Sequence, residues 1–170
     1  MQKFFIIFLL YVLFLGQLSF FVHFHFRNQT PNLILILLLL FIFFERPEEN
    51  FSFWIAIFGG FFSDIFFFSF FGIQVFIFLF LTFFLKQVIK IIHKLNIFFF
   101  LSFLVTSLIF TNILSYLIYN FQLLNINFFS LPWDKIFSIP EMLYNLTFGI
   151  ISFYLFLFIR KYAFRTEKRF

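Results

Sequence analysis

Long apolar runs alternate along the chain with short segments that carry most of its charge. The runs occupy roughly residues 4–22, 31–44, 51–85, 97–119 and 141–159. Continuous runs of this kind are typical of membrane-spanning helices, whereas a membrane β-barrel would show short segments of alternating polarity. We therefore expect an all-α integral membrane protein, built as a bundle of transmembrane helices.

The run from Phe51 to Leu85 is too long for a single span. It contains one charged residue, Asp64, and as one helix of about 35 residues it would reach about 52 Å, against a hydrocarbon core of about 30 Å. The run must therefore fold back as a hairpin, with the turn expected around Ser69–Gly72. This predicts spans at 51–68 and 72–85, a basic loop from Lys86 to Asn96, and six spans in total.

Two of the spans need further comment. The first run is followed by no A-x-A-like cleavage site, so we interpret it as a retained helix rather than a signal peptide. The second begins after Thr30, a suitable N-cap, with Pro31 in the first turn. It covers only about 21 Å, so it needs a locally thin bilayer or protein neighbours around its ends.

Charge supports the six-span arrangement. With six spans, one side carries ten Lys and Arg residues and the other carries Arg27 and Lys135. Cytoplasmic loops are enriched in Lys and Arg, so both termini are expected in the cytoplasm. The ten are Lys3, Arg46, Lys86, Lys90, Lys94, Arg160, Lys161, Arg165, Lys168 and Arg169.

Composition excludes several classes of protein. The chain is 64% hydrophobic and 11% charged, whereas soluble domains are about 45–50% apolar and about 25% charged. It has no cysteine, which excludes disulfides and thiol chemistry. The net charge of +5 could suggest nucleic-acid binding, but most cations lie at helix ends or in the basic segment after Ile159, where they would attract anionic lipid. The sequence shows no Gly/Ser-rich linker and no internal repeat, so we expect residues 1–170 to form one transmembrane domain.

Ala56, Gly60 and Asp64 form the most informative pattern. Residues four apart drift by only about 40° around a helix, so these three share one face, and small residues there let another backbone approach closely. Asp64 lies about 20 Å along the helix from Phe51, near the expected turn. Three roles stay open: capping a neighbouring helix or bonding the turn, proton or substrate transport, and partner binding.

Other candidate sites are weaker. His23 and His25 lack the further ligands that a metal site needs. Asp134 and Glu141 could suggest acid–base chemistry, but no nucleophile or metal-ligand set accompanies them, so a loop role and a helix-cap role are favoured. Trp133 suits an interfacial aromatic belt. We expect no catalytic residue, cofactor or metal.

The stretch from Asn32 to Gln87 resembles MreD, the bacterial rod shape-determining membrane protein. That family shows a Pro-led apolar helix, a short charged loop, a pattern close to G-F-x-x-G-L-x-x-D, and L-G-x about eight residues later. Gly60, Asp64 and Gly72 fall at matching positions. The departures are Ala56 at the first Gly and phenylalanines, Phe61 and Phe71, at the two Leu positions.

The resemblance implies a non-enzymatic scaffold of the cell-wall elongation machinery in the bacterial inner membrane. MreD-like proteins bind MreC, and through it associate with a RodA-type glycosyltransferase, a penicillin-binding transpeptidase and MreB filaments. Their fold is similar to that of the substrate-binding subunits of energy-coupling-factor vitamin transporters. We expect partner-binding or fold-defining roles for Ala56, Gly60, Asp64, Gly72, Trp133 and Asp134.

Two other functions have less support in the sequence. A substrate-binding subunit of a vitamin-type transporter would need a polar cavity, for which the sequence offers few groups. A lipid-modifying hydrolase would need a nucleophile–base pair or a metal set, and neither is evident. Formation of a homo-oligomer is left open by the sequence.

Overall fold

The computed structural model describes residues 12, 15, 16, 19, 30–45, 49–66, 71–91, 96–122 and 137–167. Five helices account for most of them: α2 (Leu33–Phe44), α3 (Phe51–Phe66), α4 (Ile73–Ile91), α5 (Ile97–Gln122) and α7 (Ile139–Glu167). None of the described residues is in a strand. The expectation of an all-α fold is therefore confirmed over this part of the chain.

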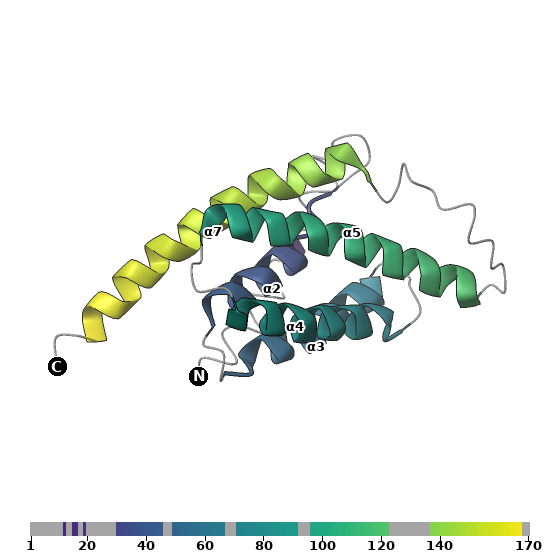
Figure 1. Ribbon diagram of the computed structural model, residues 1–170, viewed down its shortest axis with the longest axis horizontal. Helices are drawn as coiled ribbons and strands as arrows, with labels where there is room; N and C mark the ends of the chain where they lie inside the picture. Colours follow the sequence, from purple (N-terminus) through teal and green to yellow (C-terminus); the bar gives the residue numbers. More distant parts are fainter. Residues whose placement is uncertain are drawn as a thin grey trace.

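The shortest helix, α2, is the centre of the bundle. It contacts α3, α4, α5 and α7, and Figure 1 shows it lying between the α3–α4 pair and the α5–α7 pair. Nine of its 12 residues are buried. A helix of this length reaches about 18 Å and could not cross a bilayer unaided. We expected either a thin bilayer or protein neighbours around this short span, and the structure shows protein neighbours.

Aromatic side chains fill the junction of α2 with α5 and α7. The ring of Phe43 lies 5.7 Å from that of Phe100, and the ring of Phe100 lies 5.1 Å from that of Phe153. Phe44 stacks on Phe156 at 4.9 Å. Aromatic rings at these separations contribute about 0.5–1.5 kcal/mol per pair beyond their buried area. Part of the abundant phenylalanine thus forms a packed core.

Helices α3 and α4 divide the long apolar run into a hairpin. They make the most extensive helix–helix contact among the described residues, and Figure 1 shows them side by side. Gly72, at the start of α4, has φ +98°, a left-handed conformation that glycine adopts without steric cost. The chain therefore reverses direction between the end of α3 at Phe66 and the start of α4 at Ile73.

Three of the helices are long and apolar enough to cross a membrane, with apolar stretches at Ile73–Lys90, Ile97–Ile118 and Ile139–Phe158. The apolar helices α2 and α3 are shorter. The expected first span falls largely outside the described residues, so the count of six spans stays a prediction. Outward-facing side chains of the long helices are mostly apolar and suit contact with acyl chains.

Two of the helices run past the ends of the expected spans, and the loop expected at 86–96 is wrong as far as Ile91. The span expected at 72–85 continues as α4 to Ile91, so Lys86 and Lys90 are helical rather than part of a loop. The span expected at 141–159 is α7, which begins at Ile139 and includes Arg160 and Lys161. Charged residues can end a membrane span without ending a helix, because Lys and Arg are good helix formers.

Candidate functional site

Asp64 caps the first turn of α4 from within α3. Its side chain is 3% exposed. One carboxylate oxygen accepts hydrogen bonds from the backbone N–H groups of Gly72 at 2.9 Å and Val75 at 3.5 Å, and the other accepts from Gln74 at 2.9 Å. The first N–H groups of a helix have no partner within the helix, and a carboxylate is favoured beside them by the helix dipole. Of the roles considered for Asp64, helix capping is the one that these contacts display.

The face that carries Asp64 packs directly against α4. Ala56 is 0% exposed. A Cβ atom added to Gly60 would lie 2.5 Å from the Cα and 2.6 Å from the backbone nitrogen of Val75. The backbones of α3 and α4 therefore touch at this level, as small residues at four-residue spacing allow in membrane helices. This seam is filled by the chain's own helix.

Further polar contacts lie at the same end of the bundle as Asp64. The Nε2 of Gln74 donates to the Oγ of Ser115 at 3.3 Å, which joins α4 to α5. The Nδ2 of Asn112 donates to a carboxylate oxygen of Glu141 at 3.3 Å, which joins α5 to α7. We call this end the Asp64 end.

Asn145 completes the Asp64 end. It is 0% exposed. Its Oδ1 accepts from the backbone N–H of Asn32 at 2.8 Å, and its Nδ2 donates to the carbonyl of Glu141 at 2.9 Å. Asn32 in turn caps α2, accepting from the N–H of Leu35 at 3.0 Å. At this end, Asn145 of α7 thus accepts a backbone N–H at the start of α2, and Asp64 of α3 accepts those at the start of α4.

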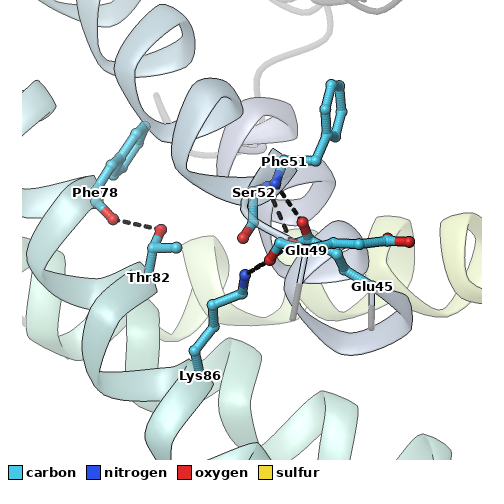
Figure 2. A network of polar contacts seen from close by, with 7 residues as sticks. All are labelled: Glu45, Glu49, Phe51, Ser52, Phe78, Thr82 and Lys86. Atoms are coloured by element: carbon cyan, nitrogen blue, oxygen red, sulfur yellow. Dashed lines mark hydrogen bonds and ion pairs between the residues drawn. The ribbon is translucent and has the colours of Figure 1, made fainter. Parts of the chain in front are cut away.

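A second cluster lies at the opposite end, here called the Glu45 end (Figure 2). Glu45 follows α2, and its carboxylate accepts from the N–H groups of Phe51 and Ser52, the latter at 3.0 Å. The Nζ of Lys86 lies 3.3 Å from Glu45 and donates to the carbonyl of Glu49. The ammonium also lies 5.2 Å from the ring centre of Phe53. The ion pair joins the end of α2 to α4, and the hydrogen bonds of Phe51 and Ser52 join both to the start of α3.

This ion pair was missed by sequence reasoning, which placed Lys86 in a loop. The side chains of Lys86 and Glu45 are only 9% and 2% exposed. A buried charge is retained where it is paired and hydrogen-bonded. The available signal was a carboxylate and an ammonium group, each directly at the edge of an apolar run, but their pairing depends on the packing of the helices.

The remaining candidate residues are placed as follows. Glu141 lies in the first turn of α7. Trp133, Asp134, His23 and His25 lie outside the described residues.

The polar groups of these clusters cap helix ends and form hydrogen bonds between helices. Within the described part of the chain, no group of three or more His, Cys, Asp or Glu could hold a metal ion. The carboxylates of Asp64 and Glu45 accept backbone N–H groups at the starts of α4 and α3. Such contacts replace water at helix ends within or beside a membrane.

Together, the all-helical fold, the three long apolar helices and the inward-facing polar clusters define a membrane helical bundle. Residues 1–163 match the family described as rod shape-determining protein MreD. The chain belongs to the MreD family, and its role therefore lies in the determination of rod shape. No curated protein and no solved structure matches the chain. The expected similarity to energy-coupling-factor subunits accordingly stays a prediction.

Proposed function

We propose that this MreD-family protein is a non-enzymatic membrane scaffold of bacterial cell-wall elongation, and that it binds an MreC-like partner. Family membership over residues 1–163 is the observation that carries the proposal. In the same proposal the protein lies in the inner membrane with six spans and both termini in the cytoplasm. RodA-type and penicillin-binding enzymes and MreB would associate with it indirectly.

The polar contacts are consistent with a scaffold. Asp64 and Glu45 each accept backbone N–H groups of the following helix, and Lys86 pairs with Glu45. These groups stabilise one arrangement of helices. A rigid bundle presents a constant lateral surface to a partner, which is what a scaffold requires.

The outer face of α7 is the surface that we expect the partner's anchor helix to contact. It is the least covered of the three long apolar helices, and its exposed residues include Thr147 and Tyr154 among apolar side chains. The exposed face of α4 instead carries phenylalanines such as Phe80 and Phe83. Association of membrane helices is favoured by close packing and by interhelical hydrogen bonds, for which α7 is better equipped than α4.

Photo-crosslinking tests this proposal. A photoreactive phenylalanine analogue at Ile151 or Leu155 of α7 should crosslink to the co-expressed MreC-like protein, and the same analogue at Phe80 or Phe83 of α4 serves as the matched control. All four side chains are exposed, so the substitutions should not disturb packing. The proposal is refuted if the two proteins do not co-purify, no position crosslinks, and depletion leaves rod shape unchanged.

No described feature favours the transporter alternative or a hydrolase over the scaffold, so neither is proposed. A substrate-binding subunit would be stabilised against heat by its small-molecule ligand at micromolar concentration.

A further inference from the structure

The described residues on either side of the α3–α4 turn, 61–65 and 71–76, are here called the tip of the hairpin. Their exposed side chains are all apolar. Phe61, Ile65, Phe71 and Phe76 are exposed by 40%, 43%, 70% and 60%. The rings of Phe61 and Phe71 lie 5.2 Å apart and so join the two sides of the tip. A turn that projects into water normally carries polar side chains, whereas the described residues on either side of this turn expose none.

The polar groups of the tip are directed inward. Asp64 and Ser63 are 3% and 4% exposed, and the Ser63 hydroxyl donates to the carbonyl of Gly59 at 2.9 Å. Asp64 accepts the N–H groups of Gly72, Gln74 and Val75. At a helix start in water, solvent can satisfy such N–H groups. In hydrocarbon each unsatisfied group costs several kcal/mol, so an internal acceptor is required.

The length of α4 indicates where the tip lies. The first outward-facing polar residues along α4 are Gln87 and Lys90. From Ile73, these positions are about 21 Å and about 26 Å away, against a hydrocarbon core of about 30 Å. If Lys90 lies at one membrane surface, the start of α4 does not reach the other. Any tilt of the helix increases the shortfall.

Helix α5 provides an internal reference for depth. Gln74 and Ser115 are joined by a hydrogen bond, so they lie at one level. Beyond Ser115, α5 continues to Gln122, about 10 Å further. Figure 1 shows α5 extending past the α3–α4 hairpin at this end. The tip is therefore the recessed part of the Asp64 end.

We infer that the tip of the α3–α4 hairpin is embedded in the hydrocarbon of the membrane leaflet at the Asp64 end, where Phe71 contacts lipid acyl chains. The two of the six proposed spans that form this hairpin then end within that leaflet, short of the membrane surface. The exposed phenylalanines of α4 continue this lipid-facing surface from Phe71 toward the Glu45 end. Asp64 makes the embedding possible, because it satisfies the start of α4 without water.

Spin labels at single cysteines test the inference. The chain has no native cysteine, so Phe71→Cys, Phe80→Cys and Asn96→Cys each give one labelled site. All three residues are exposed. Phe80 on α4 serves as the matched hydrocarbon control, and Asn96, between α4 and α5, as the aqueous control. The labelled full-length proteins are reconstituted in phosphatidylethanolamine–phosphatidylglycerol vesicles, and accessibility to oxygen and to a water-soluble nickel chelate is measured.

The position of Phe71 relative to the two controls decides the outcome. In the embedded tip, the oxygen-to-nickel accessibility ratio at Phe71→Cys resembles that at Phe80→Cys and exceeds that at Asn96→Cys by about tenfold or more, because hydrocarbon excludes the polar chelate. A ratio equal to that of Asn96→Cys places the tip in water and overturns the inference. Low accessibility to both reagents also overturns it, since protein rather than lipid then covers the tip.

Discussion

Removal of the Asp64 carboxylate is expected to destabilise the bundle more than any neighbouring polar change. In Asp64→Ala, the N–H groups of Gly72 and Gln74 each lose an acceptor at 2.9 Å, and that of Val75 loses a longer one. A hydrogen bond to a charged group contributes about 1.5–3 kcal/mol. The two short bonds therefore predict a loss of about 3–6 kcal/mol in the free energy of unfolding.

Two further variants make this prediction specific. Asp64→Asn keeps one acceptor oxygen and is expected to lose about half as much, roughly 1.5–3 kcal/mol. Ser63→Ala removes an equally buried neighbour whose hydroxyl bonds only the carbonyl of Gly59 in its own helix. Its expected loss is about 0.5–1.5 kcal/mol. The expected order of stability is Ser63→Ala, then Asp64→Asn, then Asp64→Ala as the least stable.

The assay is unfolding of the purified protein in mixed micelles, titrated with sodium dodecyl sulfate and followed by circular dichroism. Free energies of unfolding are extrapolated to zero denaturant for each variant. If Asp64→Ala is no less stable than Ser63→Ala, the capping bonds do not stabilise α4, and the reasoning about the Asp64 end fails.

Three other predictions concern backbone contact and charge pairing, each measured in the same assay. Gly60→Ala should lower the free energy of unfolding more than Gly59→Ala, because a Cβ at Gly60 meets the backbone of α4 whereas one at Gly59 meets the side-chain Cγ2 methyl of Ile34. Equal losses would contradict the backbone contact. Gly72→Ala should lower the free energy of unfolding by only about 1–2 kcal/mol. The loss comes from the left-handed φ alone, since a Cβ there has open space around it. Lys86→Met should lower the free energy of unfolding by about 3–5 kcal/mol by leaving the carboxylate of Glu45 buried without its cation, and a Glu45→Gln, Lys86→Met double variant should be more stable than Lys86→Met alone. The reverse order would show that the unpaired carboxylate is not what destabilises Lys86→Met.

The separation of α3 from α4 illustrates what could be predicted from the sequence. The run from Phe51 to Leu85 exceeds the thickness of a bilayer at the fixed rise of a helix. The shared face of Ala56, Gly60 and Asp64 likewise depends only on helical periodicity. These are local properties of a helix, and the sequence determines them without knowledge of the neighbours.

The burial of α2 could not be predicted in the same way. Its apolar residues are equally compatible with lipid and with protein around them, because hydropathy does not distinguish two apolar environments. Only the packing of four other helices around Leu33–Phe44 decides that α2 is the core. The same limit applies to α4, since Lys86 was assigned to a loop on its charge alone.

The sequence by itself determined that this protein is a helical membrane bundle with a resemblance to MreD, and that Asp64 lies near the turn of a hairpin. Tertiary structure decided which groups the carboxylates bind. Asp64 accepts hydrogen bonds from backbone N–H groups at the start of α4. Glu45 accepts them from the start of α3 and forms an ion pair with Lys86. The physical reason is the separation along the sequence over which each effect acts. Helical rise and periodicity act between near neighbours in sequence, whereas a buried charge is paired by whichever helix packs against it.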